Sequence, residues 1–68
     1  MSMFDYRLSG NNVVNVETDQ QVATISRLGE FLTLDGRPLS VRKKSGSNKC
    51  DVYVSGYHIG EMNAKYLR

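Results

Sequence analysis

Cys50 and His58 are the residues of this chain best suited to nucleophilic or acid–base chemistry. Such catalysis needs a nucleophile beside a base, or paired carboxylates that converge on one point. A tight turn at Ser55-Gly56 pairs His58 with Tyr53. The same register places Cys50 opposite Glu61, so the thiol and the imidazole stay apart. Structural zinc needs four ligands, which one cysteine and one histidine cannot supply. We therefore expect no enzyme activity, no catalytic residues, no metal site and no cofactor.

Charge is divided unevenly along the chain, and aromatic rings accompany the positive part. Residues 37–68 hold seven of the nine lysines and arginines but only two of the seven carboxylates. The first 36 residues therefore sum to about −3 and the rest to about +5, although the whole chain carries only +2. The rings among the positive charges are Tyr53, Tyr57, His58 and Tyr66. This asymmetry predicts a binding surface in the second half of the chain.

The basic residues concentrate around one predicted loop. Arg42-Lys43-Lys44 leads into the flexible segment 45–48, and Lys49 follows it. Positive side chains beside a sheet suit contacts with phosphates, and exposed tyrosines can stack on unpaired bases for about 1–3 kcal/mol each. The first hypothesis is therefore a small non-enzymatic module that binds nucleic acid through this loop and a tyrosine-bearing hairpin. Its candidate contact residues are Arg37, Arg42, Lys43, Lys44, Lys49, Tyr53, Tyr57 and His58.

The same surface also fits a second class of partner. An acidic protein surface would be attracted to the basic half, so charge alone does not separate nucleic acid from protein. A short chain without an active site can act by covering part of a larger enzyme, as inhibitors of phage or mobile-element type do. The alternative hypothesis is therefore a protein-interaction module or inhibitor. A third interpretation is that the charges only solubilise a small protein and blunt an edge strand.

Period-two patterns predict short antiparallel strands that position these residues. Residues 3–8 and 13–17 alternate apolar and polar side chains on either side of a Ser-Gly-Asn-Asn segment, which is typical of a turn. Residues 49–54 and 57–61 alternate in the same way around the Ser55-Gly56 turn. Each pair of segments predicts a hairpin.

A further hairpin is predicted around Asp35-Gly36, between residues 31–34 and 39–43. Asp-Gly favours a type I′ turn, in which both central residues need a positive φ. Pro38 has no N–H group to give to a strand ladder. We therefore expect the second strand of this hairpin to begin at a sheet edge or beside a bulge.

Residues 19–28 are predicted as the one short helix. Thr18 and Gln21 fit a capping box at its start, and Gly29 suits the position after its end. The apolar residues of the segment recur at every third position, as Val22, Ile25 and Leu28. Its β-branched residues instead favour a strand that follows a turn at Asp19-Gln20, and this alternative stays open.

Together these elements predict one small β-rich α+β domain over residues 1–68. About five or six antiparallel strands would curl into an open barrel beside the helix, and an all-β barrel is the alternative. Such a short chain buries only about 60% of its unfolded surface, so its stability is marginal and a homodimer is expected. The predicted core residues are Leu8, Val14, Val16, Ile25, Phe31, Leu32, Leu34, Leu39, Val41, Val52, Val54 and Ile59.

The C-terminal hairpin resembles part of a known family. Residues 51–60 have the sequence Asp-Val-Tyr-Val-Ser-Gly-Tyr-His-Ile-Gly, and Ala64 and Leu67 follow them. This stretch resembles the end of a HIRAN domain, in which a strand, a tight turn and an Ile-Gly strand lead into a short helix. The resemblance implies binding of single-stranded DNA ends. The chain lacks that family's proline-bearing approach to the first strand and is shorter than a usual HIRAN domain, so we do not assign it to the family.

Cys50 is the only cysteine, so the chain cannot form an internal disulfide. Together with the absence of a signal-peptide pattern, this predicts a cytoplasmic protein. Cys50 itself is expected to be a small buried apolar residue within a strand. No apolar run approaches the roughly 18–20 residues that cross a bilayer, so no membrane partner is expected.

Overall fold

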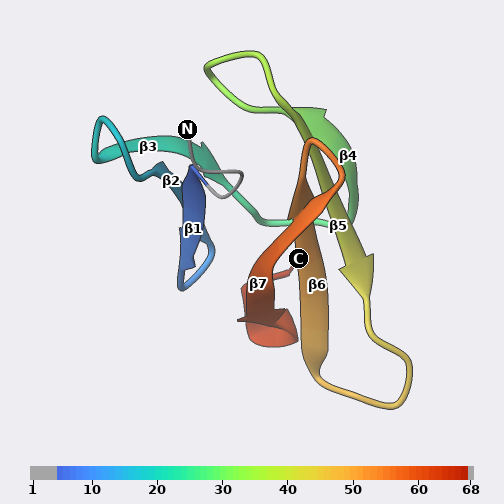
Figure 1. Cartoon of the computed structure of the whole chain (residues 1–68). Helices are drawn as coiled ribbons and strands as arrows, with labels where there is room; N and C mark the ends of the chain where they lie inside the picture. The colour runs from blue at the N-terminus through green and yellow to red at the C-terminus, as the bar shows by residue number, and fades with distance from the viewer. Residues whose placement is uncertain (1–4, 68) are drawn as a thin grey trace.

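The computed structural model describes residues 5–67, which form seven antiparallel strands and one turn of 3-10 helix (Figure 1). The strands are β1 (Tyr6–Ser9), β2 (Asn12–Asn15), β3 (Gln20–Thr24), β4 (Gly29–Leu32), β5 (Pro38–Lys43), β6 (Lys49–Val54) and β7 (Tyr57–Asn63), and the helical turn is η1 (Ala64–Tyr66). β1, β2 and β3 form a three-stranded sheet in that order. β4 to β7 form a four-stranded meander.

One cluster of buried side chains joins the two sheets. β1 packs against β7, where Gly60 leaves room for Leu8: a Cβ added to Gly60 would lie 3.5 Å from the Leu8 Cβ. The buried members come from both sheets and from the residue after β3, and they are Val13, Val22, Ile25, Leu39, Val41, Cys50, Val52, Val54 and Met62. The prediction that Cys50 is a small buried apolar residue is confirmed.

The predicted helix over residues 19–28 is wrong, because this segment forms β3 and the connection after it. Asp19 has a φ of 57° and turns the chain back on itself, so that Gln20 pairs with Asn15. Pairing with β2 and burial of Val22 outweigh the weak helical pattern, as the β-branched residues of the segment indicate. The strand alternative, with its turn at Asp19-Gln20, is the correct one.

The strands form two sheets where a single curled sheet was predicted, and the described residues form no closed barrel. The β-rich antiparallel character is confirmed, and the lack of an α-helix in residues 5–67 agrees with the all-β part of the alternative. The break lies after β3, where the N–H of Ile25 donates to the carbonyl of Asn11 (2.7 Å) and the chain then leaves the first sheet. No ladder joins β3 to β4 within residues 5–67; the N–H of Leu34 donates to the carbonyl of Val22 (2.8 Å). The fold is therefore small and β-rich, with no α-helix in the described part of the chain.

The hairpin between β4 and β5 is present, but its turn is longer than predicted. The N–H of Gly36 donates to the carbonyl of Thr33 (2.9 Å), and the N–H of Thr33 donates to the carbonyl of Arg37 (2.8 Å). Gly36 has a φ of 82° whereas Asp35 has no positive φ, so Asp35-Gly36 is not a type I′ turn. Both residues of Ser55-Gly56 have a positive φ, 54° and 83°, and the type I′ pattern occurs there, between β6 and β7.

The prediction for Pro38 is wrong, because β5 lies inside its sheet between β4 and β6. Pro38 is the first residue of β5, a position where a missing N–H is tolerated. Its carbonyl still accepts a hydrogen bond from the N–H of Ser55 (2.8 Å).

The core prediction succeeds for the second sheet and fails at three exposed residues. Five predicted core residues are buried: Ile25, Leu39, Val41, Val52 and Val54. Leu8, Phe31 and Ile59 are partly buried against that core, and Val14 is half-buried. Val16, Leu32 and Leu34 are exposed, whereas Val13, Val22 and Met62 are buried although they were not predicted. Adjacent valines in β2 fit either face of a strand, which explains why the pattern selects Val14 instead of Val13.

Candidate functional site

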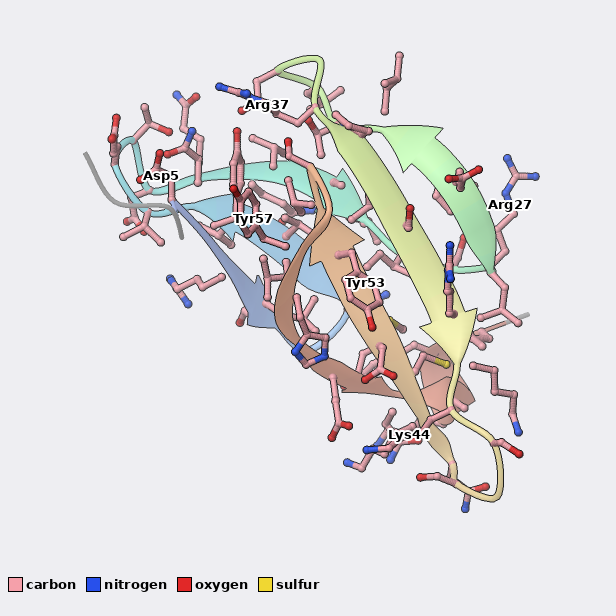
Figure 2. The ribbon with its side chains drawn as sticks, turned by 45° about the vertical axis from the view of Figure 1, so that its right-hand side comes forward. Asp5, Arg27, Arg37, Lys44, Tyr53 and Tyr57 are labelled. Carbon is pink, nitrogen blue, oxygen red and sulfur yellow. The ribbon has the colours of Figure 1, made fainter. Side chains whose placement is uncertain are left out.

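The predicted basic residues lie at both ends of the four-stranded sheet. Arg37 lies in the β4–β5 turn, whereas Lys44 lies beyond the far end of β5 (Figure 2). The six residues of β5 separate these ends by roughly 20 Å. Arg42 and Lys43 are neighbours in β5, so their side chains point to opposite faces. The structure therefore does not bring the predicted set together as one patch.

Carboxylates accompany the cations on the outer face, by which we mean the side of β5, β6 and β7 turned away from the core. Asp51 pairs across the strands with Arg42, and its Oδ1 lies 3.1 Å from Nε2 of His58. Lys44 Nζ donates to Oε2 of Glu61 (2.7 Å), and this hydrogen bond raises the pKa of Lys44. Phosphate binding relies on uncompensated positive charge, so these pairs reduce the suitability of the outer face for nucleic acid.

The remaining lysines of the predicted site lie around the β5–β6 loop. Lys43 pairs with the inward-facing Cys50 at the end of the ladder, and its Nζ donates to the carbonyl of Ser47 (3.3 Å). Lys49 begins β6, opposite Asn63. Both lysines are exposed.

The aromatic residues do not form a continuous exposed surface on which successive bases could stack. Tyr53 is half-buried and pairs with His58, with their ring centroids 5.2 Å apart and their planes tilted by 59°. Tyr57 is exposed beside the Ser55-Gly56 turn, at the far end of β6 from Lys49. The ammonium of Lys65 lies 5.5 Å from the ring centroid of Tyr66.

Cys50 and His58 do not form a catalytic pair. Ile59 is an extra residue in β7, because Tyr53 pairs with His58 while Val52 pairs with Gly60. This irregularity shifts Cys50 to a position opposite Met62 instead of the predicted Glu61. Cys50 lies on the inner face and is fully buried, whereas His58 is exposed on the outer face.

A groove of about 540 Å³ lies between β3 and β4, and we call it the β3–β4 groove. Val22 and Leu39 line it with core side chains, and Phe31 lies beside them. Leu32 and Leu34 also line it, although their side chains are 72% and 87% exposed. Large apolar side chains that gather beside a hollow are typical of a binding surface.

The main chain of β4 adds polar groups to the same groove. Neighbouring residues of an antiparallel strand direct their N–H and C=O groups alternately toward and away from the partner strand. The N–H of Thr33 donates to the carbonyl of Arg37 on the β5 side. By this alternation, the N–H and C=O groups of Phe31 point toward β5, and those of Glu30 and Leu32 point away from it. The N–H of Leu34 follows this pattern, because it donates outward to Val22. β4 therefore presents an open strand edge at Glu30 and Leu32 beside a partly apolar hollow, whereas at Leu34 the edge is bonded to β3.

A polar cluster holds the Leu34 end of the groove. The hydroxyl groups of Tyr6 and Thr33 both donate to the carboxylate of Asp35, and the N–H of Arg37 donates to Oγ1 of Thr33 (2.8 Å). Burial alone raises the pKa of Asp35, but hydrogen bonds from Thr33 and Tyr6 outweigh burial and hold that pKa below its usual value. Burial and the bond to Asp35 raise the pKa of Tyr6. The cluster ties β1 of the first sheet to the β4–β5 turn of the second.

Leu32 and Leu34 are predicted core residues that instead lie exposed beside the groove. The alternation of a strand could have shown that they are exposed. Leu32 and Leu34 are even-numbered and lie on one face, whereas Phe31 and Thr33 are odd-numbered and lie on the other. Phe31 pairs with the buried Leu39, so the leucines must point to the opposite face. The sequence contains no comparable signal for the groove itself, which depends on how the two sheets meet.

No cluster of three or more histidine, cysteine, aspartate or glutamate side chains in residues 5–67 is arranged to hold a metal ion. No helix in that part of the chain has the length and apolar character needed to cross a membrane.

Comparisons with family models, with curated proteins and with solved structures gave no significant match. No family model supports the resemblance of residues 51–67 to the end of a HIRAN domain.

Proposed function

We propose that this protein is a small non-enzymatic interaction module that binds an extended apolar segment of a larger protein in the β3–β4 groove. The observation that carries the proposal is the exposure of Leu32 and Leu34 beside a hollow lined by core residues. Removing a leucine side chain from water is worth about 1.5–3 kcal/mol when burial is complete. Two such residues at one edge provide a driving force that the outer face, with its paired charges, does not.

The open edge of β4 specifies the form of the bound segment. An extended peptide that adds to a strand edge gains main-chain hydrogen bonds, while its alternate side chains enter neighbouring pockets. Glu30 and Leu32 supply the outward main-chain groups, and the groove beside them accepts apolar side chains. This proposal develops the protein-interaction hypothesis in preference to the nucleic-acid one.

The test selects ligands from a displayed library of random hexapeptides. Enriched peptides should be rich in apolar residues and should bind a Leu32→Lys/Leu34→Lys variant at least about tenfold more weakly, as measured by fluorescence polarisation. The variant should melt at the temperature of the parent, because both side chains are exposed. Val16→Lys is the matched control: it also places a charge at an exposed apolar residue, outside the groove, and should leave the affinity unchanged.

Three results would overturn the proposal. Peptides that bind the double variant and the parent equally would place the binding surface elsewhere. A homodimer in sedimentation equilibrium that the double variant abolishes would assign the groove to a second copy of the chain. Tight binding of mixed single- and double-stranded oligonucleotides at low salt, lost when Arg42, Lys43, Lys44 and Lys49 are replaced by serine, would support the nucleic-acid hypothesis instead.

A further inference from the structure

The charge of the β3–β4 groove identifies the chemistry of its partner more closely than its apolar surface does. Arg27 is the one charged residue among those that line the groove. It belongs to the connection between β3 and β4, so it lies at the opposite end of β4 from Leu34 (Figure 2). The groove thus has two exposed leucines, Leu32 and Leu34, toward one end and a positive charge at the other.

Arg27 contacts an aromatic ring but forms no ion pair with a carboxylate of residues 5–67. Its guanidinium lies over the ring of Phe31, 5.0 Å from the ring centroid, and Phe31 itself lines the groove. Among residues 5–67, the ion pairs are Arg7–Asp19, Lys44–Glu61 and, when His58 is protonated, His58–Asp51, and none includes Arg27. Glu30 is close in sequence, but its Oε1 accepts from the Ser40 hydroxyl on β5 (3.5 Å). The guanidinium therefore keeps donors for a carboxylate from outside the chain.

We infer that the partner segment carries a carboxylate at the end that meets Arg27 and apolar side chains along the rest of its length. This inference rests on the proposed binding of an extended segment in the groove. Residues 29–34 span roughly 20 Å when extended, which matches a segment of about six residues. A carboxylate beside Arg27 would lie next to an apolar wall, where an ion pair is screened less than in open solvent.

Defined peptides test the inference directly. The probes are fluorescein-labelled hexapeptides of alternating valine and threonine, blocked at both termini, with glutamate at the first or at the last position so that both strand directions are covered. Matched probes carry glutamine or lysine in place of glutamate. The better glutamate peptide should bind the parent about fivefold more tightly than its glutamine counterpart, and the advantage should shrink at high salt.

The preference should follow Arg27 alone. Arg27→Gln should bring the ratio of glutamate to glutamine affinity close to one, and Arg27→Glu should favour the lysine peptide. Arg42→Gln is the matched control, because it removes an exposed arginine on the outer face and should leave the ratio unchanged. Thermal melts should be similar for all three variants, since both arginines are exposed.

The outcomes separate this inference from the proposed function. Binding that requires Leu32 and Leu34 but shows no preference for glutamate would overturn the inference and leave the proposed function standing. A preference for glutamate that persists in Arg27→Gln would also overturn it. Failure of every peptide to bind, or binding that survives Leu32→Lys/Leu34→Lys, would overturn both. A preference that disappears with Arg27→Gln and reverses with Arg27→Glu would support the inference.

Discussion

The β3–β4 groove and the outer face of β5, β6 and β7 are both exposed to solvent. They differ in whether their side chains have partners within the described part of the chain. On the outer face, Asp51 lies beside His58, and Glu61 accepts a hydrogen bond from Lys44. At the groove, Leu32 and Leu34 lie in solvent, and the guanidinium of Arg27 lies over the ring of Phe31. Paired charges need no external partner, whereas exposed leucines gain free energy when another molecule covers them.

The comparison shows why net charge along a sequence is a weak guide to a binding surface in a small β protein. Strand pairing places residues that are distant in sequence next to each other, so the carboxylates of the basic half lie among its cations. Asp51 and Glu61 are the only side-chain carboxylates in residues 37–68; Glu61 forms an ion pair with Lys44, and Asp51 lies within hydrogen-bond distance of His58. An apolar surface cannot be neutralised in the same way.

The largest expected effect is a difference in stability between variants at Leu39, at the floor of the groove, and at Leu34, at its rim. Leu39→Ala should lower the free energy of unfolding by about 2–4 kcal/mol, because Leu39 is 2% exposed and its truncation leaves a cavity in the core. Leu34→Ala should change it by no more than about 0.5 kcal/mol, because that side chain is 87% exposed. Urea denaturation of the two variants measures the difference. Equal losses would mean that Leu34 packs within the fold and is not available to a partner.

A smaller effect should come from the cluster that holds the Leu34 end of the groove. Asp35→Asn weakens the hydrogen bonds from Thr33 and Tyr6, and it should cost on the order of 1 kcal/mol at neutral pH. Tyr6→Phe removes one donor and should cost less. Glu17→Gln is a control, since it replaces an exposed carboxylate that lies outside this cluster. A loss for Glu17→Gln as large as that for Asp35→Asn would show that the effect comes from net charge.

The loss of stability caused by Asp35→Asn should become smaller at acid pH. The pKa of Asp35 is lower in the folded protein than its ordinary value, so the ionised carboxylate favours folding. This contribution should be fully present above the unfolded pKa of about 3.9 and should be lost as the pH falls through the lower folded value. The stability difference between parent and Asp35→Asn should therefore be constant above about pH 5 and should narrow below about pH 4. A difference that grows on acidification would contradict the hydrogen-bonded carboxylate.

Local patterns predicted the strands of this fold better than they predicted its assembly. The alternation at Cys50, Val52 and Val54 correctly identified the buried face of β6, because alternate residues of one strand lie on the same face of the sheet. The segment at residues 19–28 was ambiguous, and only its pairing with β2 decides in favour of a strand. The groove could not be predicted, because it arises where β3 and β4 meet in the absence of a ladder. Its position depends on contacts between the sheets, such as the Leu34–Val22 hydrogen bond.

The smallest effect should come from the paired charges of the outer face. Lys44→Gln and Glu61→Gln, alone and combined, form a double-mutant cycle for a pair whose side chains are 52% and 37% exposed. Salt screens exposed ion pairs, so the coupling between the two substitutions should be the smallest of these effects and should decrease in 1 M salt. Neither substitution should alter the affinity for groove-binding peptides, because Lys44 and Glu61 lie outside the groove. If Lys44→Gln instead weakened peptide binding as strongly as Leu32→Lys/Leu34→Lys does, the outer face would belong to the binding surface and the contrast between the two regions would no longer hold.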